Sequence, residues 1–489
     1  MSIFSKLFGR SDEPGAIRRQ IEQARAQNDD ATVRRLLEGL AKTGDASAQR
    51  ELGNAYLVAT AYDNARVWLE KAAAQGDAEA QHQLGNLYLR GQGVPKNSTT
   101  AHEWQEKAAA QGYAAAQTLL GSYYAIGDGV AQDYEKARTW FEKAAAQHDA
   151  EAQYQLGLLY FGGLGIAQDY TIAREWCEQA AAQGNAAAQN LLGRLYSGGL
   201  GVAQDHAKAR DWYTQAAERG NAEAQSILAL YYYNGEGGEQ NLDKARTWFE
   251  KAAAQGDSDA LRNLGIIYAE GEGVAQDYNK AYDYWKQAAA QGDTAAQNGL
   301  AQLYHDGLGV TQDFAQAYQW WKTAAEQDNA NAQNHLAICY LRGEGVNKDS
   351  KKACEWFEKA ALRGHVVAQY GLGILYGHSE ELDLPPQPAT ALLWLEKAAG
   401  AGHGGAQNAL GIRYARGIDV NQDYGKARAY WEQSAAGGDP EAQTNLGILY
   451  REGLGVTLDP DTAKSWFEKA AAQGFAAAQE ALQALRACS

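Results

Sequence analysis

The sequence predicts an all-α fold: an α-solenoid of about twelve helix-turn-helix repeats with N- and C-terminal capping helices. Three observations predict it. A glutamine that follows Ala-x-Ala, or a close variant, recurs at a spacing that is mostly 36 residues. Each interval carries two stripes of apolar and small residues at helical spacing, with a glycine-rich turn between them. All 13 tryptophans fall in the second of the two helices.

The chain begins with residues 1–12, which are expected to form an N-terminal amphipathic leader. Its apolar residues, among them Phe4 and Phe8, would share one helical face and form a short docking or membrane-surface segment. The alternative is an N-terminal cap or a frayed leader. Any membrane contact is expected only through residues 1–10, which lack the apolar core and cleavage site of a secretory signal peptide. Residues 13–44 are expected to form an N-terminal helical cap.

Twelve repeats are expected to occupy residues 45–474, and a marker glutamine lies in the first helix of each. The marker positions are Gln49, Gln81, Gln117, Gln153, Gln189, Gln225, Gln297, Gln333, Gln369, Gln407 and Gln443, followed by Gln479 in the last segment. Leu261 stands at the marker position of the seventh repeat. Residues 475–489 are expected to form the C-terminal capping helix.

Residues 149–184 illustrate one repeat. Asp149 is the expected N-cap of the first helix, which contains the Leu156-Gly157 pair. The sequence Gly-Gly-Leu-Gly then ends this helix, because glycine adopts a left-handed backbone without strain. Asp169 opens the second helix.

The recurring tryptophans are expected to serve packing rather than catalysis, because they return at a nearly fixed phase. They are Trp68, Trp104, Trp140, Trp176, Trp212, Trp248, Trp285, Trp320, Trp321, Trp356, Trp394, Trp431 and Trp466. Each ring is expected to fill the space between the two helices of its repeat. The Leu-Gly pair of the first helix is expected to let the two helices approach closely at the glycine.

Residues 113–148 carry the pattern of a repeat nearly whole. Its residues are Ala116, Leu120-Gly121, Tyr124, Gly127, Gly129-Val130, Asp133-Tyr134, Lys136-Ala137, Trp140 and Glu142-Lys143-Ala144-Ala145. This pattern resembles the Sel-1-like repeat, a relative of the tetratricopeptide repeat, and it recurs over about 430 of the 489 residues. The resemblance implies a right-handed superhelix that binds proteins. Members of the family are typically adaptors, signalling scaffolds or bacterial host-interaction factors, and some bacterial relatives are immunity or regulatory partners of toxins and secretion systems.

Three repeats depart from the pattern. The first has a short turn at residues 57–62, the sixth has an altered turn at residues 235–240, and the tenth replaces its turn with residues 378–390. The segment 378–390 is either a recognition loop, a bend in the superhelix or neutral drift in an exposed turn. Some small secreted relatives carry a disulfide in each repeat, and this chain lacks those cysteines.

The charge, the apolar runs and the cysteine count of the sequence limit which partners and which cellular compartment are expected. The chain has 44 Lys and Arg against 60 Asp and Glu, a net charge of −16 that repels nucleic acid, so no nucleic-acid partner is expected. No run of about 18 apolar residues exists that could span a membrane. With only four cysteines and no signal peptide, the chain is expected to reside in a reducing bacterial cytoplasm.

No catalytic constellation is recognisable in the sequence. The glycine-rich turns lack the Lys-Ser/Thr pair of a phosphate loop and follow no strand. The nine histidines are scattered at varying phases, and no zinc-binding spacing occurs. Cys339 and Cys354 are expected to be buried free thiols. The sequence therefore predicts a non-enzyme with no catalytic residues, no metal site and no cofactor.

Partner binding is expected on the first helix of each repeat, at offsets +1, +5 and +8 from the marker glutamine, which share one face. Analogy with related solenoids places this face on the concave side. The predicted groove residues are Tyr154, Leu158, Phe161, Asn190, Arg194, Tyr233, Asn298, Gln302, His305, Asn334, Tyr370 and Asn408. The asparagines could clamp the backbone of an extended peptide, and the aromatic residues could anchor it. The alternative is that the asparagines are copied surface residues and that the apolar ones pack against the adjacent repeat.

The function expected from these observations is a non-enzymatic scaffold or adaptor that binds a partner protein or peptide in the solenoid groove. The acidic repeats favour a partner with a basic surface. One alternative is an immunity or antitoxin-like inhibitor of a toxin or secreted effector. Another is a regulatory component of a membrane-associated or enzymatic complex. The convex face and residues 378–390 remain alternative binding surfaces.

Overall fold

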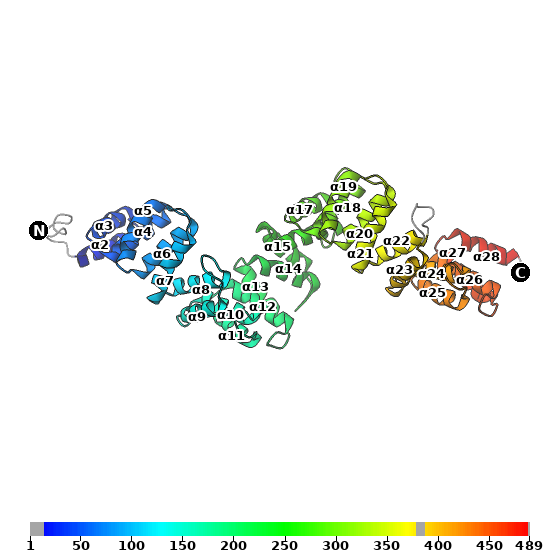
Figure 1. The fold of residues 1–489 in the computed structure, drawn as a ribbon, viewed down its shortest axis with the longest axis horizontal. Coiled ribbons are helices and arrows are strands. Elements are labelled where there is room, and N and C mark those ends of the chain that lie inside the picture. The colour runs from blue at the N-terminus through cyan, green and yellow to red at the C-terminus, as the bar shows by residue number, and fades with distance from the viewer. Residues whose placement is uncertain (1–13, 378–386, 488–489) are drawn as a thin grey trace. The chain divides into compact units, whose positions relative to one another are not determined.

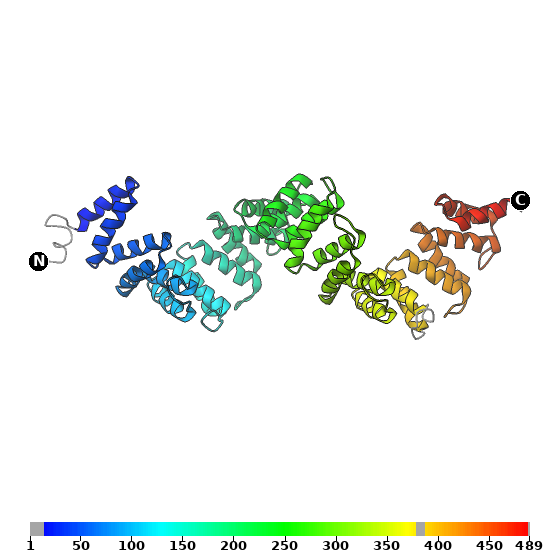
Figure 2. The ribbon, with the colours of Figure 1, turned by 90° about the horizontal axis from the view of Figure 1, so that it is seen from above.

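The computed structural model describes residues 14–377 and 387–487, and within these ranges every regular element is an α-helix. Figures 1 and 2 show the helices stacked in chain order within each part of the chain. The predicted all-α solenoid is confirmed. The predicted leader, residues 1–12, and the segment 378–386 lie outside the described residues.

The chain divides after Gln255 into two compact units. The helices of unit 1 are α2 (Pro14–Ala26), α3 (Asp30–Lys42), α4 (Ala46–Val58), α5 (Tyr62–Ala74), α6 (Ala78–Arg90), α7 (Ser98–Ala110), α8 (Ala114–Ile126), α9 (Tyr134–Ala145), α10 (Ala150–Gly162), α11 (Tyr170–Ala182), α12 (Ala186–Gly198), α13 (His206–Glu218), α14 (Ala222–Asn234) and α15 (Leu242–Ala254). Those of unit 2 are α16 (Ser258–Glu270), α17 (Tyr278–Ala290), α18 (Thr294–Asp306), α19 (Phe314–Glu326), α20 (Ala330–Arg342), α21 (Ser350–Leu362), α22 (Val366–Gly377), α23 (Pro388–Gly400), α24 (Gly404–Arg416), α25 (Tyr424–Ala436), α26 (Pro440–Glu452), α27 (Pro460–Ala472) and α28 (Ala476–Ala487).

From α4 onward the even-numbered helices are the first helices of the repeats, here called A helices. The odd-numbered ones, from α5 onward, are called B helices. Within each unit, every A helix packs against the B helix of its own repeat, and every B helix packs against the next A helix. Helix α28 packs against α27 in the same way.

Local capping sets the ends of these helices. The Asp149 carboxylate accepts a hydrogen bond from the backbone N–H of Ala152 at 2.8 Å, and α10 then ends at Gly163, whose φ is 66°. The Asp169 carboxylate begins α11 by accepting from the backbone N–H of Ile172 at 3.1 Å. These caps satisfy backbone groups that a helix end leaves without partners. The N-caps lie where the sequence predicts them.

The glycine of the Leu-Gly pair brings the two helices of a repeat together. A Cβ atom added at Gly121 would lie 2.6 Å from the ring of Phe141, and one added at Gly157 would lie 2.5 Å from the Sγ atom of Cys177. Both distances are too short for any side chain larger than glycine unless a neighbour moves. The predicted close approach at this glycine is confirmed.

The large side chain that fills this contact is usually the residue after the recurring tryptophan. Phe141 is fully buried, whereas Trp140 is half-buried and packs at the edge of the cluster formed by α7 and α8. The Nζ atom of Lys143 lies 3.9 Å from the Trp140 ring centroid, on the open face of the ring. The expectation that each tryptophan fills the space between paired helices is therefore wrong for this common arrangement. Of the 13 tryptophans, those that are buried are Trp321, Trp394 and Trp431.

The marker glutamine joins one repeat to the next. Gln117 is buried, and its Nε2 atom donates to the carbonyl of Ala109 on the preceding B helix at 3.1 Å. Its Oε1 atom accepts from the Nε2 atom of Gln147, at the end of its own B helix, at 2.9 Å. Gln49 makes the same bond to the carbonyl of Ala41 on α3. The bond to a B-helix carbonyl is also made by Gln81, Gln189, Gln225, Gln297, Gln333, Gln369, Gln407 and Gln443. A buried amide with partners on both sides explains why glutamine recurs here.

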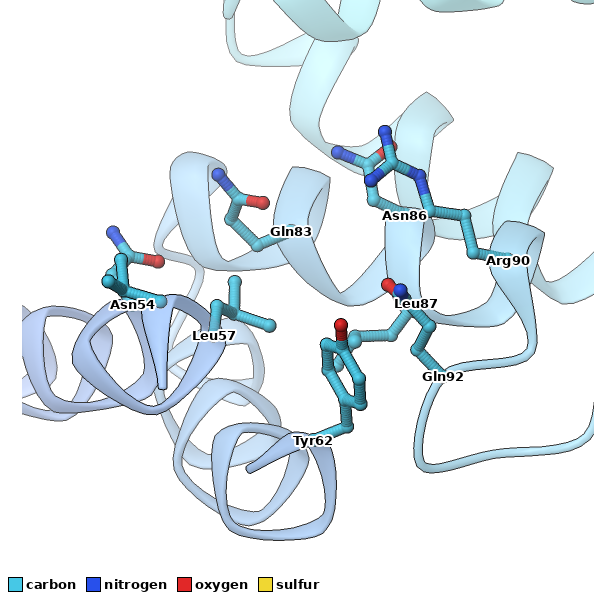
Figure 3. A pocket seen from close by; sticks show the side chains of 9 residues that line it. Asn54, Leu57, Tyr62, Gln83, Asn86, Leu87, Arg90 and Gln92 are labelled. Atoms are coloured by element: carbon cyan, nitrogen blue, oxygen red, sulfur yellow. The ribbon is translucent and has the colours of Figure 1, made fainter. Parts of the chain in front are cut away.

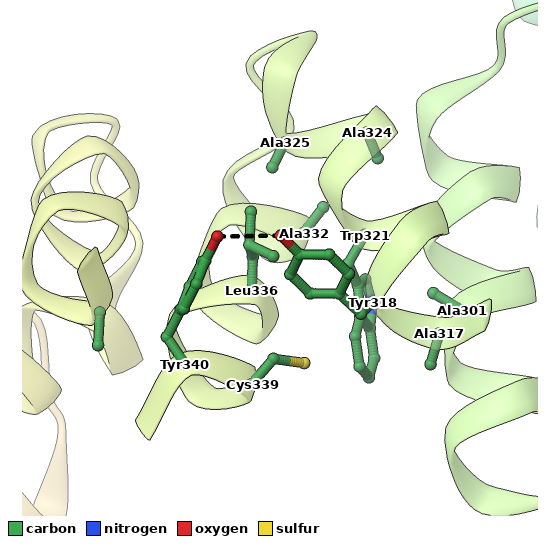
Figure 4. Close-up of a cluster of buried hydrophobic side chains, with 11 residues drawn as sticks. Ala301, Ala317, Tyr318, Trp321, Ala324, Ala325, Ala332, Leu336, Cys339 and Tyr340 are labelled. Carbon is green, nitrogen blue, oxygen red and sulfur yellow. Dashed lines mark hydrogen bonds between the residues drawn. The ribbon is translucent and has the colours of Figure 1, made fainter. Parts of the chain in front are cut away.

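The core between two successive repeats is built from alanines and a few large residues, as Figure 4 shows for α19 and α20. Alanines from both helices leave room for Trp321 and Leu336, which are almost completely buried. The hydroxyl groups of Tyr318 and Tyr340 lie 2.9 Å apart and share a hydrogen bond. The small residues let the helices approach, and the aromatic pair closes the edge of the cluster.

Candidate partner-binding face

Three cavities lie on the A helices, each between two consecutive A helices of one unit. They are the α4–α6 cavity of about 410 Å³, the α18–α20 cavity of about 170 Å³ and the α22–α24 cavity of about 420 Å³. Their walls come from the same repeat positions: offsets +5 and +8 of the earlier helix, and +2, +5, +6 and +9 of the later helix, counted from the marker glutamine. We call the surface formed by offsets +1, +2, +5, +8 and +9 the A-helix face.

The α4–α6 cavity has apolar walls and an amide rim (Figure 3). It is lined by Asn54, Leu57, Val58, Tyr62, Gln83, Asn86, Leu87, Arg90 and Gln92. The short first turn creates it, because α4 ends at Val58 and α5 begins only a few residues later at Tyr62. Val58 is 88% exposed, an unusual fraction for a large apolar side chain.

The α18–α20 cavity is lined by a chain of polar contacts. The Nδ1 atom of His305 lies 2.5 Å from the Oδ1 atom of Asp306, and its Nε2 atom lies 3.3 Å from the Oε2 atom of Glu344. The His335 ring stacks on Trp321 with centroids 4.8 Å apart. Burial, with smaller contributions from His305 and His365, lowers the pKa of His335 to about 4, so its ring is neutral at pH 7.

The α22–α24 cavity combines an isoleucine floor with charges at both ends. Its lining comprises Tyr370, Ile374, Gly377, Gly405, Asn408, Ala409, Ile412, Arg413, Arg416, Ile418, Asp439 and Glu441. Burial and the nearby carboxylates of Glu441 and Asp439 raise the pKa of Tyr370, so its hydroxyl stays protonated and can donate a hydrogen bond. The ring of Tyr370 stacks on His403 at 4.5 Å.

The residues predicted in unit 1 form a partly buried surface. Tyr154, Leu158 and Phe161 are half-buried and pack against the cluster that includes Cys177 and Leu195. The Arg194 guanidinium lies 5.2 Å from the Phe161 ring centroid, and Arg194 is exposed. Tyr233 is half-buried. Asn190 is 5% exposed, and its Nδ2 atom donates to Glu223 of the next repeat at 2.9 Å.

The residues predicted in unit 2 are mostly engaged within the fold. The Oδ1 atom of Asn298 accepts from the Trp321 indole N–H at 3.1 Å, and the Nδ2 atom of Asn408 donates to Glu441 at 2.8 Å. Asn334 is buried. The amide of Gln302 donates to Asp306 at 2.6 Å. Asn190, Asn334 and Asn408 thus lie deeper than an exposed peptide clamp requires. Asn190 and Asn408 bond to the start of the next A helix, whereas Asn298 bonds to the B helix of its own repeat.

The structure brings some predicted residues together in one cavity and not others. Gln302 and His305 line the α18–α20 cavity, and Tyr370 and Asn408 line the α22–α24 cavity. The other predicted residues line none of these three cavities.

Sequence reasoning missed the residues at offsets +2, +6 and +9. Arginine ends the later A helix of all three cavities, as Arg90, Arg342 and Arg416. At most other repeats offset +9 carries no cation. Comparing each offset across the twelve repeats for charged outliers would have found these arginines.

The cysteines and the possible metal ligands within residues 14–377 and 387–487 are relevant to nucleophilic and metal chemistry. Burial raises the pKa of Cys177 and Cys339 to about 12 and that of Cys354 to about 11, so these thiols stay protonated at pH 7. No group of three or more His, Cys, Asp or Glu side chains in ranges 14–377 and 387–487 could hold a metal ion. In the same ranges, no helix has the length and hydropathy needed to cross a bilayer.

The chain is similar to several proteins of known structure. The chain is similar to a protective antigen of uropathogenic Escherichia coli that displays an SLR fold, with 35% identity, a TM-score of 0.75, and coverage of 91% of this chain and 96% of the antigen. It is also similar to a Sel1 repeat protein from Oxalobacter formigenes, with 35% identity, a TM-score of 0.49, and coverage of 63% of this chain and 90% of that one. An immunity protein from Pseudomonas aeruginosa matches with 21% identity and a TM-score of 0.29, over 47% of this chain and 82% of its own. No curated protein matches with significance.

The family profile described as Sel1 repeat matches twelve successive segments of the sequence. These are residues 46–77, 78–113, 114–149, 150–185, 186–221, 222–257, 258–293, 294–329, 330–365, 366–403, 405–439 and 440–475. The matched segments begin with the A helices and together cover most of the chain. The chain therefore belongs to the Sel1 repeat family.

Proposed function

We propose that this protein is a non-enzymatic scaffold whose A-helix face binds a partner protein. The observation that carries the proposal is the equivalence of the three cavities. They fall in different repeats and in both units, yet their walls come from the same offsets of the A helices. Concave sites with apolar walls and a few polar groups are the usual places of recognition in proteins.

The chemistry of the face supports a protein or peptide as the ligand. Exposed apolar side chains such as Val58 and Ile418 lie beside arginines that carry a full charge. Arginine is enriched among the residues that carry the binding energy of protein interfaces, and the buried centres of interfaces are apolar. The net charge of −16 favours a partner with a basic surface, because opposite charges speed the encounter.

We also propose a reducing, cytoplasmic location. Cys177, Cys339 and Cys354 are buried free cysteines. Such thiols persist in a reducing compartment.

The test compares two triple variants that change net charge equally. The A-face variant carries Arg90→Ala, Arg194→Ala and Arg342→Ala. The matched control carries Arg66→Ala, Arg138→Ala and Arg246→Ala on B helices, where each arginine pairs with a glutamate one turn away. Circular dichroism first establishes that both variants keep the helicity of the wild type.

Affinity capture from the native lysate, read by quantitative mass spectrometry, then compares the two variants with the wild type. We expect the A-face variant to lose partners that the control retains. One dominant partner lost in this way would favour a dedicated inhibitor of the immunity type, and several would favour a general adaptor. Equal capture by both variants would contradict binding on the A-helix face.

A further inference from the structure

We propose that the α22–α24 cavity binds an extended peptide segment that carries a basic, an apolar and an acidic side chain at alternate positions. This inference rests on the proposed function, because it names the partner chemistry of one part of the A-helix face. Three parts of the cavity carry it: an acidic end, an apolar floor and a basic end.

The acidic end is formed by Asp439 and Glu441, at the start of α26. The equivalent pair in the second repeat, Asp77 and Glu79, is neutralised by Arg50 of the preceding repeat, at 3.1 and 3.2 Å. At the α22–α24 cavity, the repeat position that corresponds to Arg50, offset +1, is occupied by Asn408.

Asn408 supplies an uncharged amide to Glu441 at 2.8 Å, where Arg50 supplies a cation. Among the described residues, neither Asp439 nor Glu441 forms an ion pair. Two carboxylates without a cation attract a lysine or arginine side chain of a ligand.

The basic end is formed by Arg413 and Arg416. Arg413 stands at offset +6, which carries no charged residue in any other repeat, and only 9% of its side chain is exposed. It pairs with Asp419, which stands where most other repeats have the second glycine of the turn and keeps a left-handed φ of 58°. A left-handed φ is uncommon for a residue other than glycine, so neighbouring residues hold Asp419 in this conformation.

Because Asp419 neutralises Arg413, the charge left at this end of the cavity is that of Arg416. Arg416 is exposed at the end of α24 and forms no ion pair among the described residues. It is therefore available to an acidic side chain of the ligand.

The floor between the two ends is apolar. Ile374 and Ile412 come from neighbouring A helices, and Ile418 follows the end of α24 with 42% of its surface exposed. Burying this isoleucine-lined surface against a leucine or isoleucine of the ligand is favourable, because it removes apolar area from water.

The length of the cavity sets the spacing of the ligand residues. Asn408 and Arg416 are eight residues apart on α24, which corresponds to about 12 Å along the helix axis. Four steps of an extended peptide cover about 13 Å, and residues i, i+2 and i+4 project to the same side. The matching pattern is basic-x-apolar-x-acidic, with the basic residue over Asp439 and Glu441 and the acidic residue over Arg416.

The test measures fluorescence anisotropy of labelled peptides with the full-length protein. The probe is fluorescein-Gly-Lys-Thr-Leu-Thr-Glu-Gly-amide. Two further peptides are its composition-matched isomer fluorescein-Gly-Leu-Thr-Lys-Thr-Glu-Gly-amide and the double-lysine peptide fluorescein-Gly-Lys-Thr-Leu-Thr-Lys-Gly-amide. We expect the probe to bind at least about tenfold more tightly than either.

A charge reversal separates recognition from a structural effect. Arg416→Glu is expected to weaken binding of the probe by about tenfold and to strengthen binding of the double-lysine peptide, because the new carboxylate accepts the second lysine. Loss of structure would not improve any peptide. The matched control is Arg428→Glu on the B helix of the same repeat, which is expected to leave both affinities unchanged.

Three results would overturn the inference: no probe binding at millimolar protein, equal binding of the isomer, or an Arg416→Glu variant that does not change the preference. The outcome is distinct from that of the capture experiment, whose A-face variant keeps Arg416. If that variant loses its partners while the probe does not bind, the proposed function stands and this site is wrong. If the probe binds and the capture experiment shows no loss, the cavity is a peptide site and the wider A-helix face is not.

Discussion

Amide side chains hold the joints between repeats. The marker Gln117 is bonded both to the preceding B helix and to Gln147, at the end of the B helix of its own repeat. Asn190 and Asn408 bond to carboxylates of the next A helix. A buried amide left without partners costs about 1–3 kcal/mol, so these residues are tied to their positions by hydrogen bonding. The exposed arginines at the ends of A helices, Arg90, Arg342 and Arg416, are instead proposed to meet a partner.

The buried His335 imidazole predicts a loss of stability in weak acid. Its pKa is about 4 in the folded protein, against 6.5 for an ordinary histidine. The unfolded chain therefore binds a proton between these values while the folded chain does not, so the contribution is complete above pH 6.5 and is lost as the pH falls toward 4. We expect unit 2 to lose up to about 3 kcal/mol of its free energy of unfolding from this group.

Urea denaturation of the wild type and of a His335→Gln variant at pH 7 and pH 5 measures this effect. All other ionisable groups are present in both proteins, so the difference between the two pH dependences isolates His335. An identical pH dependence in the variant would contradict the assignment.

In most repeats a glycine on the A helix contacts the side chain of a B-helix residue, whereas the sixth, eighth and ninth repeats carry alanine at this position. Gly121 and Phe141 form this contact in the third repeat, while Trp140 packs at the edge under Lys143. Trp140 and Phe141, which are adjacent on the B helix, therefore contribute differently to the packing of the repeat. The sequence pattern repeats both positions with similar regularity.

A pair of alanine variants tests this difference. Phe141→Ala is expected to lower the free energy of unfolding by about 3–5 kcal/mol, because it opens a cavity in a fully buried contact. Trp140→Ala is expected to cost less, because the ring is half-buried and water can reach the vacated edge. Chemical denaturation of both variants is the measurement, and a larger loss for Trp140→Ala would contradict the assigned packing.

The packing contacts that stabilise the chain are local, because each helix packs mainly against its neighbours in sequence. A repeat protein of this kind is stabilised by the sum of its repeats and of the contacts between adjacent ones. Each of the two units has its own series of buried clusters, for example around Phe141 in unit 1 and around Trp321 in unit 2.

The division after Gln255 predicts that each unit folds independently. Residues 1–255 and 256–489, expressed separately, are expected to be helical and to unfold cooperatively, because each carries complete A–B pairs with buried cores. Circular dichroism during thermal unfolding measures this. A polypeptide that is unfolded or melts without a transition would show that its unit depends on the rest of the chain.

Much of the fold could be predicted from the sequence because its signals are local. The period of the marker glutamine, the Asp N-caps and the glycine turns act within one repeat, and the structure places the helices accordingly. The predicted offsets +5 and +8 line the cavities, and their role in binding a partner stays a prediction. The role of the asparagines at offset +1 was harder to foresee, because it depends on the start of the next A helix.

What the sequence determined by itself is the repeat, its number and its helix-turn-helix form, since periodicity, capping and turn chemistry are properties of short segments. Only the tertiary structure decided which side chains face a neighbour and which face solvent. It buried Phe141 rather than Trp140, directed Asn408 to Glu441, and placed Arg416 at the end of an isoleucine-lined cavity. These outcomes depend on the packing of successive helices, which brings together residues about 30 positions apart that no local pattern connects.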